Sequence, residues 1–378
     1  MNAIGYIDPM SYNNLEIYDV SLLSNSNYNK QIYFFCSNKL KTNYIDGVII
    51  KKIFNYNDKK FISKLFLYLL SLLKLIYYIR INKIRLLHVQ WFRIPIIEFY
   101  FYKLIRLIFP KIKLIHTAHN VVPHNSTSKG NKYLRKLYIL FDSIILHTDK
   151  SLNEIKLITR CTTKKKFVVI PHGILKYPYS KDDINNNFKK ITFLEKICNK
   201  TVFASLGAQS YYKGIDILVD VWIETPELAK NESIFLIIAG KGKIPRIDEL
   251  KKMDNVIVEN KFIDDLTFVT YMSLADVVLM PYRKISQSGV LLTALSLHRA
   301  ILVSDAGGLT DPLKFGNIGW IVKAGDKSSL TETLIFLTKN KSCISTINNN
   351  IDIWNKVVLN YDWNEIKKKT FSLYDSLL

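Results

Sequence analysis

Glycine-rich turns in the second half of the sequence follow apolar runs, and each one lets backbone amides approach an anion. GAQSYYKG contains Lys213 directly before its last glycine, and AGKGK ends at Lys243. Amides at a helix start and the helix dipole favour negative charge, and a lysine adds a point charge. We therefore expect a phosphate site at these turns, with a solvated Lys213 as the alternative.

Two further turns lie in the stretch SQSGVLLTALSLHRAILVSDAGG, which begins at Ser286. Gly289 allows its own amide and that of Val290 to face a ligand at a helix start, beside the hydroxyl of Ser288. The next apolar run ends in a glycine pair, Gly307 and Gly308. Because several such turns at one edge suit two linked phosphates, we expect a nucleotide diphosphate to bind there.

Histidine is concentrated in one part of the first half. Five of the seven histidines occur in HTAHNVVPH, LHTD and PHG, and each segment follows an apolar run that predicts a strand. Their side chains can therefore gather at one edge of a sheet. Since no HExxH or carboxylate-rich pattern accompanies them, we favour sugar or phosphate recognition over metal binding. The five are His116, His119, His124, His147 and His172.

Short β-rich runs alternate with longer helical runs, which is typical of a parallel, doubly wound α/β sheet. In the first half we predict strands at residues 3–7, 31–36, 47–50, 86–89, 114–117, 143–147 and 167–170. Helices are predicted between them, at residues 15–24, 61–80, 94–109, 132–141 and 151–160.

The alternation restarts after a polar stretch, KYPYSKDDINNNFKK, with strands predicted at residues 201–206, 234–239, 256–258, 277–280, 300–304 and 319–322. We therefore expect two Rossmann-like domains, 1–175 and 200–355, joined by a linker at 176–199. A last helix within 356–378 is expected to pack back toward the first domain. Ligands of such sheets bind beyond the carboxyl ends of the strands, so we expect the site in the cleft between the domains.

Composition indicates a globular protein that stays inside the cell. The 378 residues fit two domains, and 48% of them are hydrophobic. The start, MNAIGYIDPM, lacks the basic region and apolar core of a signal peptide. Four scattered cysteines have no metal-like spacing and are expected to be free thiols in a reducing compartment: Cys36, Cys161, Cys198 and Cys343.

The net charge of +21 is concentrated in the first half, where residues 1–172 hold 27 Lys and Arg against 9 Asp and Glu. Such an excess indicates an anionic partner: lipid, phosphate or nucleic acid. Residues 61–80 and 94–113 are apolar with recurring Lys and Arg. They are too charged for a spanning helix but suit the surface of an anionic membrane. Two core helices with solvated lysines are the alternative.

Several motifs occur in the order HNVVPH, VVIPHGI, YKG, LIIAG, SLADVVLMPYR, SGVLLTALSLHRAILVSDAGGL and YDWNEI. Their order and spacing over both halves resemble the GT-B glycosyltransferases related to family 4. The resemblance implies that the second domain binds a nucleotide-sugar donor, with no cofactor and no required metal. The first domain would then bind the acceptor.

The resemblance also implies which residues take part. Lys213 would contact the donor phosphates together with Ser288 and the amides of Gly289 and Val290. The nucleotide would be bordered by Lys243, Phe262 and Thr293. His119 would lie near the donor sugar, as a sugar contact or a base, with His124 as a second candidate. The other residues expected to line the cleft are Asn120, His172, Gly307 and Gly308.

The sequence departs from the family pattern where charged residues are usual. Members usually carry two glutamates with seven residues between them, and Ile285 and Thr293 align with these positions. An arginine is also usual where Ala208 stands. Arg283 is our candidate for the charge that this missing arginine would supply.

The missing glutamates leave the stereochemistry open. An inverting reaction needs a base beside the acceptor hydroxyl, such as His119 or His124. A retaining reaction needs mainly stabilisation of the departing diphosphate, which Lys213 and the Gly289 turn supply. We favour retention.

We therefore predict a hexosyltransferase on the cytoplasmic face of the plasma membrane that extends a lipid-linked oligosaccharide, as in surface polysaccharide or O-antigen assembly. The alternative is a non-catalytic protein on the same scaffold that binds anionic lipid or nucleic acid. No nucleic-acid partner is expected, because the sequence contains no recognisable nucleic-acid-binding module.

Overall fold

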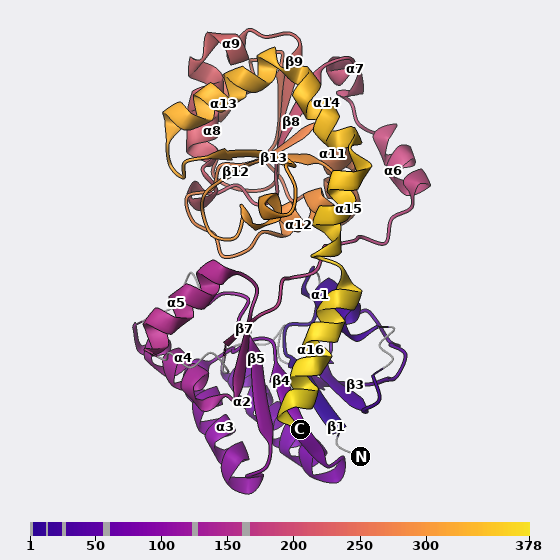
Figure 1. Ribbon diagram of the computed structural model, residues 1–378, viewed down its shortest axis with the longest axis vertical. Coiled ribbons are helices and arrows are strands. Elements are labelled where there is room, and N and C mark those ends of the chain that lie inside the picture. The colour runs from indigo at the N-terminus through magenta and orange to yellow at the C-terminus, as the bar shows by residue number, and fades with distance from the viewer. Residues whose placement is uncertain (1–2, 13, 25–27, 56–60, 123–127, 161–166) are drawn as a thin grey trace. The chain divides into compact units, whose positions relative to one another are not determined.

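The computed structural model describes residues 3–12, 14–24, 28–55, 61–122, 128–160 and 167–378, and it divides the chain into two compact units (Figure 1). Unit 1 comprises Met1–Gly173 and Trp363–Leu378, and unit 2 comprises Ile174–Asp362. We expected residues 176–199 to be a linker. In the structure they belong to unit 2 and carry helices α6 (Lys181–Phe188) and α7 (Leu194–Ile197).

Unit 1 is built on a seven-stranded sheet with the order β3-β2-β1-β4-β5-β6-β7, and all of its pairings are parallel. The order reverses between β1 and β4, which makes the sheet doubly wound as predicted. Each predicted strand is confirmed to within a few residues at its ends. The strands are β1 (Ala3–Asp8), β2 (Ile32–Ser37), β3 (Val48–Phe54), β4 (Ile84–Val89), β5 (Lys113–Thr117), β6 (Ser143–Leu146) and β7 (Phe167–Val169).

Helices cover both faces of this sheet because successive strand residues point to opposite faces. One core packs side chains of four helices against residues such as Leu87 and Leu114: α2 (Phe61–Ile81), α3 (Pro95–Ile108), α4 (Ser128–Leu140) and α5 (Asp149–Thr159). The other core packs two helices against residues such as Leu86 and Ile115: α1 (Asn14–Leu23) and α16 (Trp363–Leu377). The last helix of the chain thus completes unit 1.

Unit 2 is built on a six-stranded sheet with the order β10-β9-β8-β11-β12-β13, again parallel throughout. The order reverses between β8 and β11. All six predicted strands are confirmed: β8 (Thr201–Leu206), β9 (Ile234–Ala239), β10 (Val256–Glu259), β11 (Val277–Met280), β12 (Ala300–Ser304) and β13 (Gly319–Val322).

The other helices of unit 2 connect or flank these strands. Residues of β8, β9, β11 and β12 are buried throughout, as expected for a parallel sheet covered on both faces. The connecting elements are η1 (Tyr211–Lys213), α8 (Ile215–Glu224), α9 (Pro226–Ala229), α10 (Ile247–Leu250), α11 (Asp265–Leu274), α12 (Gly289–Ser296), η2 (Asp311–Lys314), α13 (Lys327–Lys339), α14 (Lys341–Asn349) and α15 (Ile351–Leu359).

Two sequence expectations concern the membrane and the thiols. Among the helices that the structure describes, none combines the length and apolarity that crossing a bilayer requires. The described cysteines, Cys36, Cys198 and Cys343, are free, and Cys161 lies outside the described residues.

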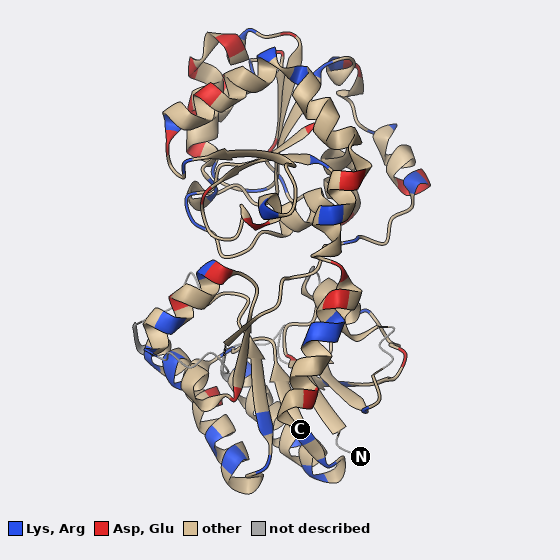
Figure 2. Cartoon of the chain, viewed as in Figure 1, with Lys and Arg blue, Asp and Glu red and all other residues tan. Residues whose placement is uncertain are grey.

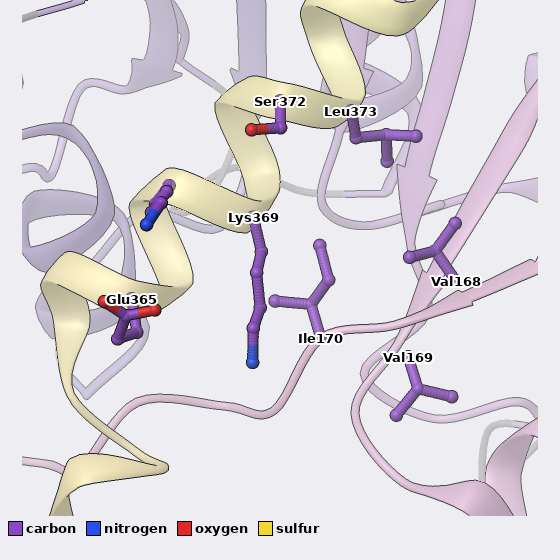
Figure 3. Close-up of a pocket in the computed structure, with 8 residues that line it drawn as sticks. Val168, Val169, Ile170, Glu365, Lys369, Ser372 and Leu373 are labelled. Carbon is purple, nitrogen blue, oxygen red and sulfur yellow. The ribbon is translucent and has the colours of Figure 1, made fainter.

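An open pocket of about 490 Å³ lies between β7 and α16 in unit 1. Figure 3 shows the side chain of Lys369 extending from α16 alongside Ile170. None of the candidate site residues lines this pocket, so it does not mark the predicted site. Its lining residues are Val168, Val169, Ile170, Glu365, Lys368, Lys369, Ser372 and Leu373.

The start of α3 depends on a buried carboxyl group. Glu98 is almost fully buried and accepts hydrogen bonds from the Tyr68 hydroxyl at 2.5 Å and from the amides of Arg93 and Ile94 at 2.9 Å. The two amides precede the first turn of α3 and have no carbonyl four residues back within a helix. Burial nevertheless raises the pKa of Glu98 to about 7.

We expect Glu98→Ala to lower the free energy of unfolding by about 3 kcal/mol, because it removes the acceptor of one buried hydroxyl and two partly buried amides. Glu98→Gln, which keeps one accepting oxygen, should lose less. Urea unfolding measures both, with Glu195→Ala at an exposed position as the control. Equal losses for Glu98→Ala and the control would contradict this role.

Candidate functional site

Lys213 lies at the switch point of the unit 2 sheet, in the connection that follows β8. It ends η1, and Gly214 follows it with a φ of 70° that favours glycine. A Cβ added to Gly207 would lie 3.3 Å from Nζ of Lys213 and 3.4 Å from a methyl group of Val290. The ammonium group of Lys213 is therefore held over the backbone of the first turn and beside the start of α12.

The charge of Lys213 has no counter-charge among the described residues. No ion pair in the described part of the chain includes it, and burial lowers its pKa to about 8. The ring of Tyr282 lies 5.4 Å from its Nζ. A partly buried cation with a depressed pKa and no carboxylate partner is suited to an anionic ligand.

The start of α12 lies next to this lysine. Ser288 is the N-cap residue, and its hydroxyl accepts from the amide of Leu291 at 3.3 Å. The amides of Gly289 and Val290 stand at the first two helical positions, where no intrahelical acceptor exists. Lys213, Gly289 and Val290 thus meet in unit 2, and Ser288 shapes this helix start through its capping bond.

Arg283 does not supply the free charge that we assigned to it. Its guanidinium binds both carboxylate oxygens of Asp216, at 2.5 and 2.7 Å, and lies 4.0 Å above the ring of Tyr211. Asp216 neutralises this charge, so Arg283 ties the loop before α12 to the start of α8. The sequence alone did not reveal Asp216 as its partner.

The other predicted nucleotide residues differ in accessibility. Lys243 and Phe262 are exposed on the loops after β9 and β10, which meet where the amide of Gly242 donates to Asn260 at 2.9 Å. Thr293 is buried and its hydroxyl donates to the carbonyl of Gly289 at 2.9 Å. Thr293 aligns with the second glutamate of the family pattern, but its hydroxyl is bonded to the helix backbone.

The glycine pair after β12 has a packing role. Gly307 has a φ of 55°, and a Cβ there would collide with the carbonyl of Ile285. The turn therefore packs against the loop that leads to α12. Gly308 is buried in the same turn.

The predicted histidines gather in unit 1 at the carboxyl edge of its sheet. His119 lies after β5, partly exposed, with its Nδ1 3.3 Å from Nε2 of His147 and its Nε2 3.1 Å from Gln90. Trp91 stacks on the His119 ring at 4.6 Å, and the ring of Tyr18 meets it edge-on at 4.9 Å. The imidazole is thus fixed from four sides.

Main-chain carbonyls orient three of the other imidazoles. Nδ1 of His116 donates to Val89 at 2.8 Å, that of His147 to Ile170 at 2.8 Å and that of His172 to Gly173 at 2.7 Å. Burial lowers the pKa values of these three, to about 3, 3 and 4 respectively. The cluster is therefore uncharged at neutral pH.

The remaining predicted positions in this region are less informative. Asn120 is partly buried directly after His119. His124 lies outside the described residues. No group of three or more His, Cys, Asp or Glu side chains within the described ranges is arranged to hold a metal ion.

Sequence reasoning missed the polar residues that support the cluster. His88 and Gln90 are fully buried and occupy alternate positions at the end of β4, so they share one face of the sheet. The available signal was LHVQW, in which two polar residues interrupt an otherwise apolar strand. Tyr18 and Trp363 also pack at the histidine cluster, with their ring centroids 5.3 Å apart.

A buried acid pair at the same edge was also missed. Asp8 ends β1 and lies next to Asp19 of α1, whose Oδ1 accepts from the Tyr6 hydroxyl at 2.7 Å. In the hydrogen bond between the two carboxyl groups Asp19 is the donor and Asp8 the acceptor, because this bond raises the pKa of Asp19 and partly offsets the rise in that of Asp8. Burial raises the pKa of Asp8 to about 7 and that of Asp19 well above its ordinary value.

Residues 200–340 match the family described as glycosyl transferases group 1. The chain is similar to the O-antigen chain mannosyltransferase C of Escherichia coli, with 22% identity over 250 residues, which are 62% of this chain and 64% of that protein. The match thus spans slightly less than two thirds of that relative.

The fold is shared with solved structures along the whole chain. Sucrose-phosphate synthase from Thermosynechococcus elongatus matches with a TM-score of 0.72 at 15% identity, covering 100% of this chain and 99% of that one. Anabaena HepE in complex with UDP and glucose matches with a TM-score of 0.69 at 14% identity, covering 100% of each chain. The chain therefore has the GT-B fold, as its motif order predicted, and residues 200–340 resemble the glycosyl transferases group 1.

The acid pair generates a prediction about pH. The pKa of Asp8 is higher in the folded protein than in the unfolded chain, so its contribution to stability is present below pH 4 and is lost as the pH rises through about 7. Asp8→Asn removes this loss, since the amide oxygen accepts from the Asp19 carboxyl and the amide group does not ionise. At pH 8 we expect the variant to melt above wild type by at least about 3 °C.

Melting temperatures of wild type and Asp8→Asn between pH 5 and 8 measure the difference. Asp46→Asn, an exposed aspartate in the same unit, is the control. If wild type and Asp8→Asn show parallel pH dependence, the acid pair does not share a proton as described.

Proposed function

We propose that this chain is a glycosyltransferase that moves a hexosyl group from a nucleotide-diphosphate sugar to an oligosaccharide acceptor carried by a membrane lipid. The observation that carries the proposal is the position of Lys213. Its ammonium group lies over the Gly207 turn and beside Val290, and it has no ion-pair partner among the described residues.

The donor part of the proposal is supported by the chemistry of unit 2. Two linked phosphates carry negative charge that Lys213 and the amides at the start of α12 would stabilise, both in the bound donor and on the departing diphosphate. Anabaena HepE, which shares the fold, was solved with UDP and glucose. A uridine diphosphate sugar is therefore the first donor class to test.

The acceptor part is supported by the surface of unit 1. Helices α2 and α3 expose large apolar side chains, and the cations Lys74, Arg80 and Lys103 are exposed on them. Figure 2 shows Lys and Arg predominating on α3 and α4, whereas both signs of charge mark the helices of unit 2. The exposed apolar residues are Phe66, Leu69, Leu70, Leu73, Tyr77, Ile81, Tyr100, Leu104, Leu107 and Ile108.

Such a surface suits an anionic bilayer on the cytoplasmic side, because apolar side chains enter the interface while cations meet lipid phosphates. The E. coli relative described above is named as an O-antigen chain mannosyltransferase. We therefore place the acceptor among the lipid-linked glycans of surface polysaccharides.

Retention of the anomeric configuration is part of the proposal. Burial and the neighbouring imidazoles hold the pKa of His119 well below its ordinary value, so this histidine is a weak base for removing a proton from an acceptor. Stabilisation of the departing diphosphate by Lys213 asks for no such base.

A thermal-shift panel of UDP-, GDP-, dTDP- and CMP-sugars tests the donor site. One nucleotide class at 100 times its dissociation constant should stabilise wild type by about 2.7 kcal/mol, and this gain should disappear in Lys213→Ala. Lys251→Ala, at an exposed lysine in the same unit, should keep it. If no nucleotide sugar stabilises wild type, while anionic lipid or an oligonucleotide does, the non-catalytic alternative replaces the enzyme.

Sedimentation with vesicles that contain phosphatidylglycerol tests the membrane surface. Replacing Leu104 and Leu107 together by Glu should weaken binding at least about tenfold, because burial of one leucine is worth about 1.5 kcal/mol or more. Leu107 is 79% exposed, so this change should leave folding intact. The matched control replaces Leu157 and Leu359, which are 80% and 64% exposed, by Glu. Equal weakening in both double variants would contradict a specific role for α3.

A further inference from the structure

A main-chain carbonyl determines where protons lie in the histidine cluster of unit 1. Nδ1 of His147 lies 2.8 Å from the carbonyl oxygen of Ile170, which only accepts, so this nitrogen carries a proton. A neutral imidazole has one N–H group, so Nε2 of His147 has a lone pair. That lone pair faces Nδ1 of His119 at 3.3 Å, and Nδ1 of His119 must therefore be the donor.

The side-chain amide of Gln90 lies within hydrogen-bond distance of Nε2 of His119, the second ring nitrogen. The structure places its Oε1 3.1 Å from Nε2 of His119 and its NH2 group 3.0 Å from Nε2 of His88, and rotating the amide by half a turn exchanges these two contacts. With the NH2 group toward neutral His119, the amide oxygen accepts from His88, whose Nδ1 then accepts from the Tyr374 hydroxyl at 2.5 Å. With the oxygen toward His119, that ring needs a second proton.

The surroundings of His119 decide between these two amide orientations. No carboxylate is among the groups that shift its pKa, and burial together with the neighbouring imidazoles lowers that pKa well below its ordinary value. A second proton on the ring is therefore unfavourable near pH 7. The titratable groups that face His119 are Tyr18 of α1, His88 of β4, His116 of β5, and His147 and His172, which follow β6 and β7.

We propose that Gln90 and His147 are positioning residues that hold His119 as the neutral tautomer with its proton on Nδ1. The lone pair of Nε2 then accepts from the Gln90 amide, and a substrate hydroxyl at this edge of the sheet takes the place of that amide as the donor. The nature of that substrate, a sugar, rests on the proposed function, whereas the tautomer does not. The chain of hydrogen bonds begins at the hydroxyl of Tyr374 in α16 and ends at the carbonyl of Ile170. The last helix of unit 1 therefore takes part in fixing His119.

Long-range proton–nitrogen correlation spectra of the whole chain, labelled with 15N in histidine, test the tautomer at pH 7 without any substrate. They distinguish a protonated from an unprotonated ring nitrogen, and His119→Asn assigns the signals of that ring. We expect His119 to be protonated on Nδ1 alone. A proton on Nε2 of His119 overturns the proposal, and this result would leave the donor-binding prediction for unit 2 untouched.

Gln90→Glu tests the positioning role directly. A carboxylate there only accepts, so it should bring a second proton to Nε2 of His119 and raise its pKa by about 1 to 3 units. In a transferase assay, the acid limb of the kcat/KM profile should move upward by the same amount. Gln31→Glu, at an exposed glutamine of unit 1, should change neither. A His119 spectrum that is unchanged in Gln90→Glu overturns the role, and if this variant does not fold, the wild-type spectrum still decides the tautomer.

Discussion

The reversal of strand order in each sheet is the constraint on which the rest of the structure depends. Between β1 and β4 in unit 1, and between β8 and β11 in unit 2, the connections leave in opposite directions, so neither covers the carboxyl ends of the two central strands. Polar residues can occupy these edges without breaking the apolar layers. Gln90 and Asp8 lie at the edge in unit 1, and Lys213 and Pro281 follow the corresponding strands in unit 2.

Desolvation then determines the character of each edge. In unit 1 burial keeps the imidazoles neutral and raises the pKa values of Asp8 and Asp19, so that edge offers hydrogen bonds with little net charge. In unit 2 the same effect lowers the pKa of Lys213 to about 8 and leaves its charge without a carboxylate partner. The two edges therefore suit different ligands, uncharged hydroxyl groups and phosphates respectively. This division agrees with a sugar acceptor and a nucleotide donor.

The sequence predicted the fold well because the fold depends on local patterns. Thirteen apolar runs mark the thirteen strands that the structure describes, and their alternation with helical runs favours parallel pairing. The meeting of Lys213 with Gly289 and Val290 was also predictable, since glycine turns that follow neighbouring parallel strands share an edge. The partners of individual charges were not predictable. Arg283 pairs with Asp216, 67 residues away in the sequence, and only the register of the folded loops brings them together.

The hydrogen-bond partners of His119 were also not predictable from the sequence. His119 was identifiable from its motif, but its role depends on Gln90, His147 and a carbonyl at residue 170, which come from three different strand ends. Sequence spacing carries no information on which ring nitrogen bears a proton. That information arises only when an obligatory acceptor, the Ile170 carbonyl, is placed against an imidazole that burial keeps neutral. A histidine fixed in this way accepts a hydrogen bond from a hydroxyl group but does not change its charge, so it is suited to recognition. Under the proposed function, the stabilisation of a departing diphosphate then falls to Lys213 and the start of α12 in unit 2.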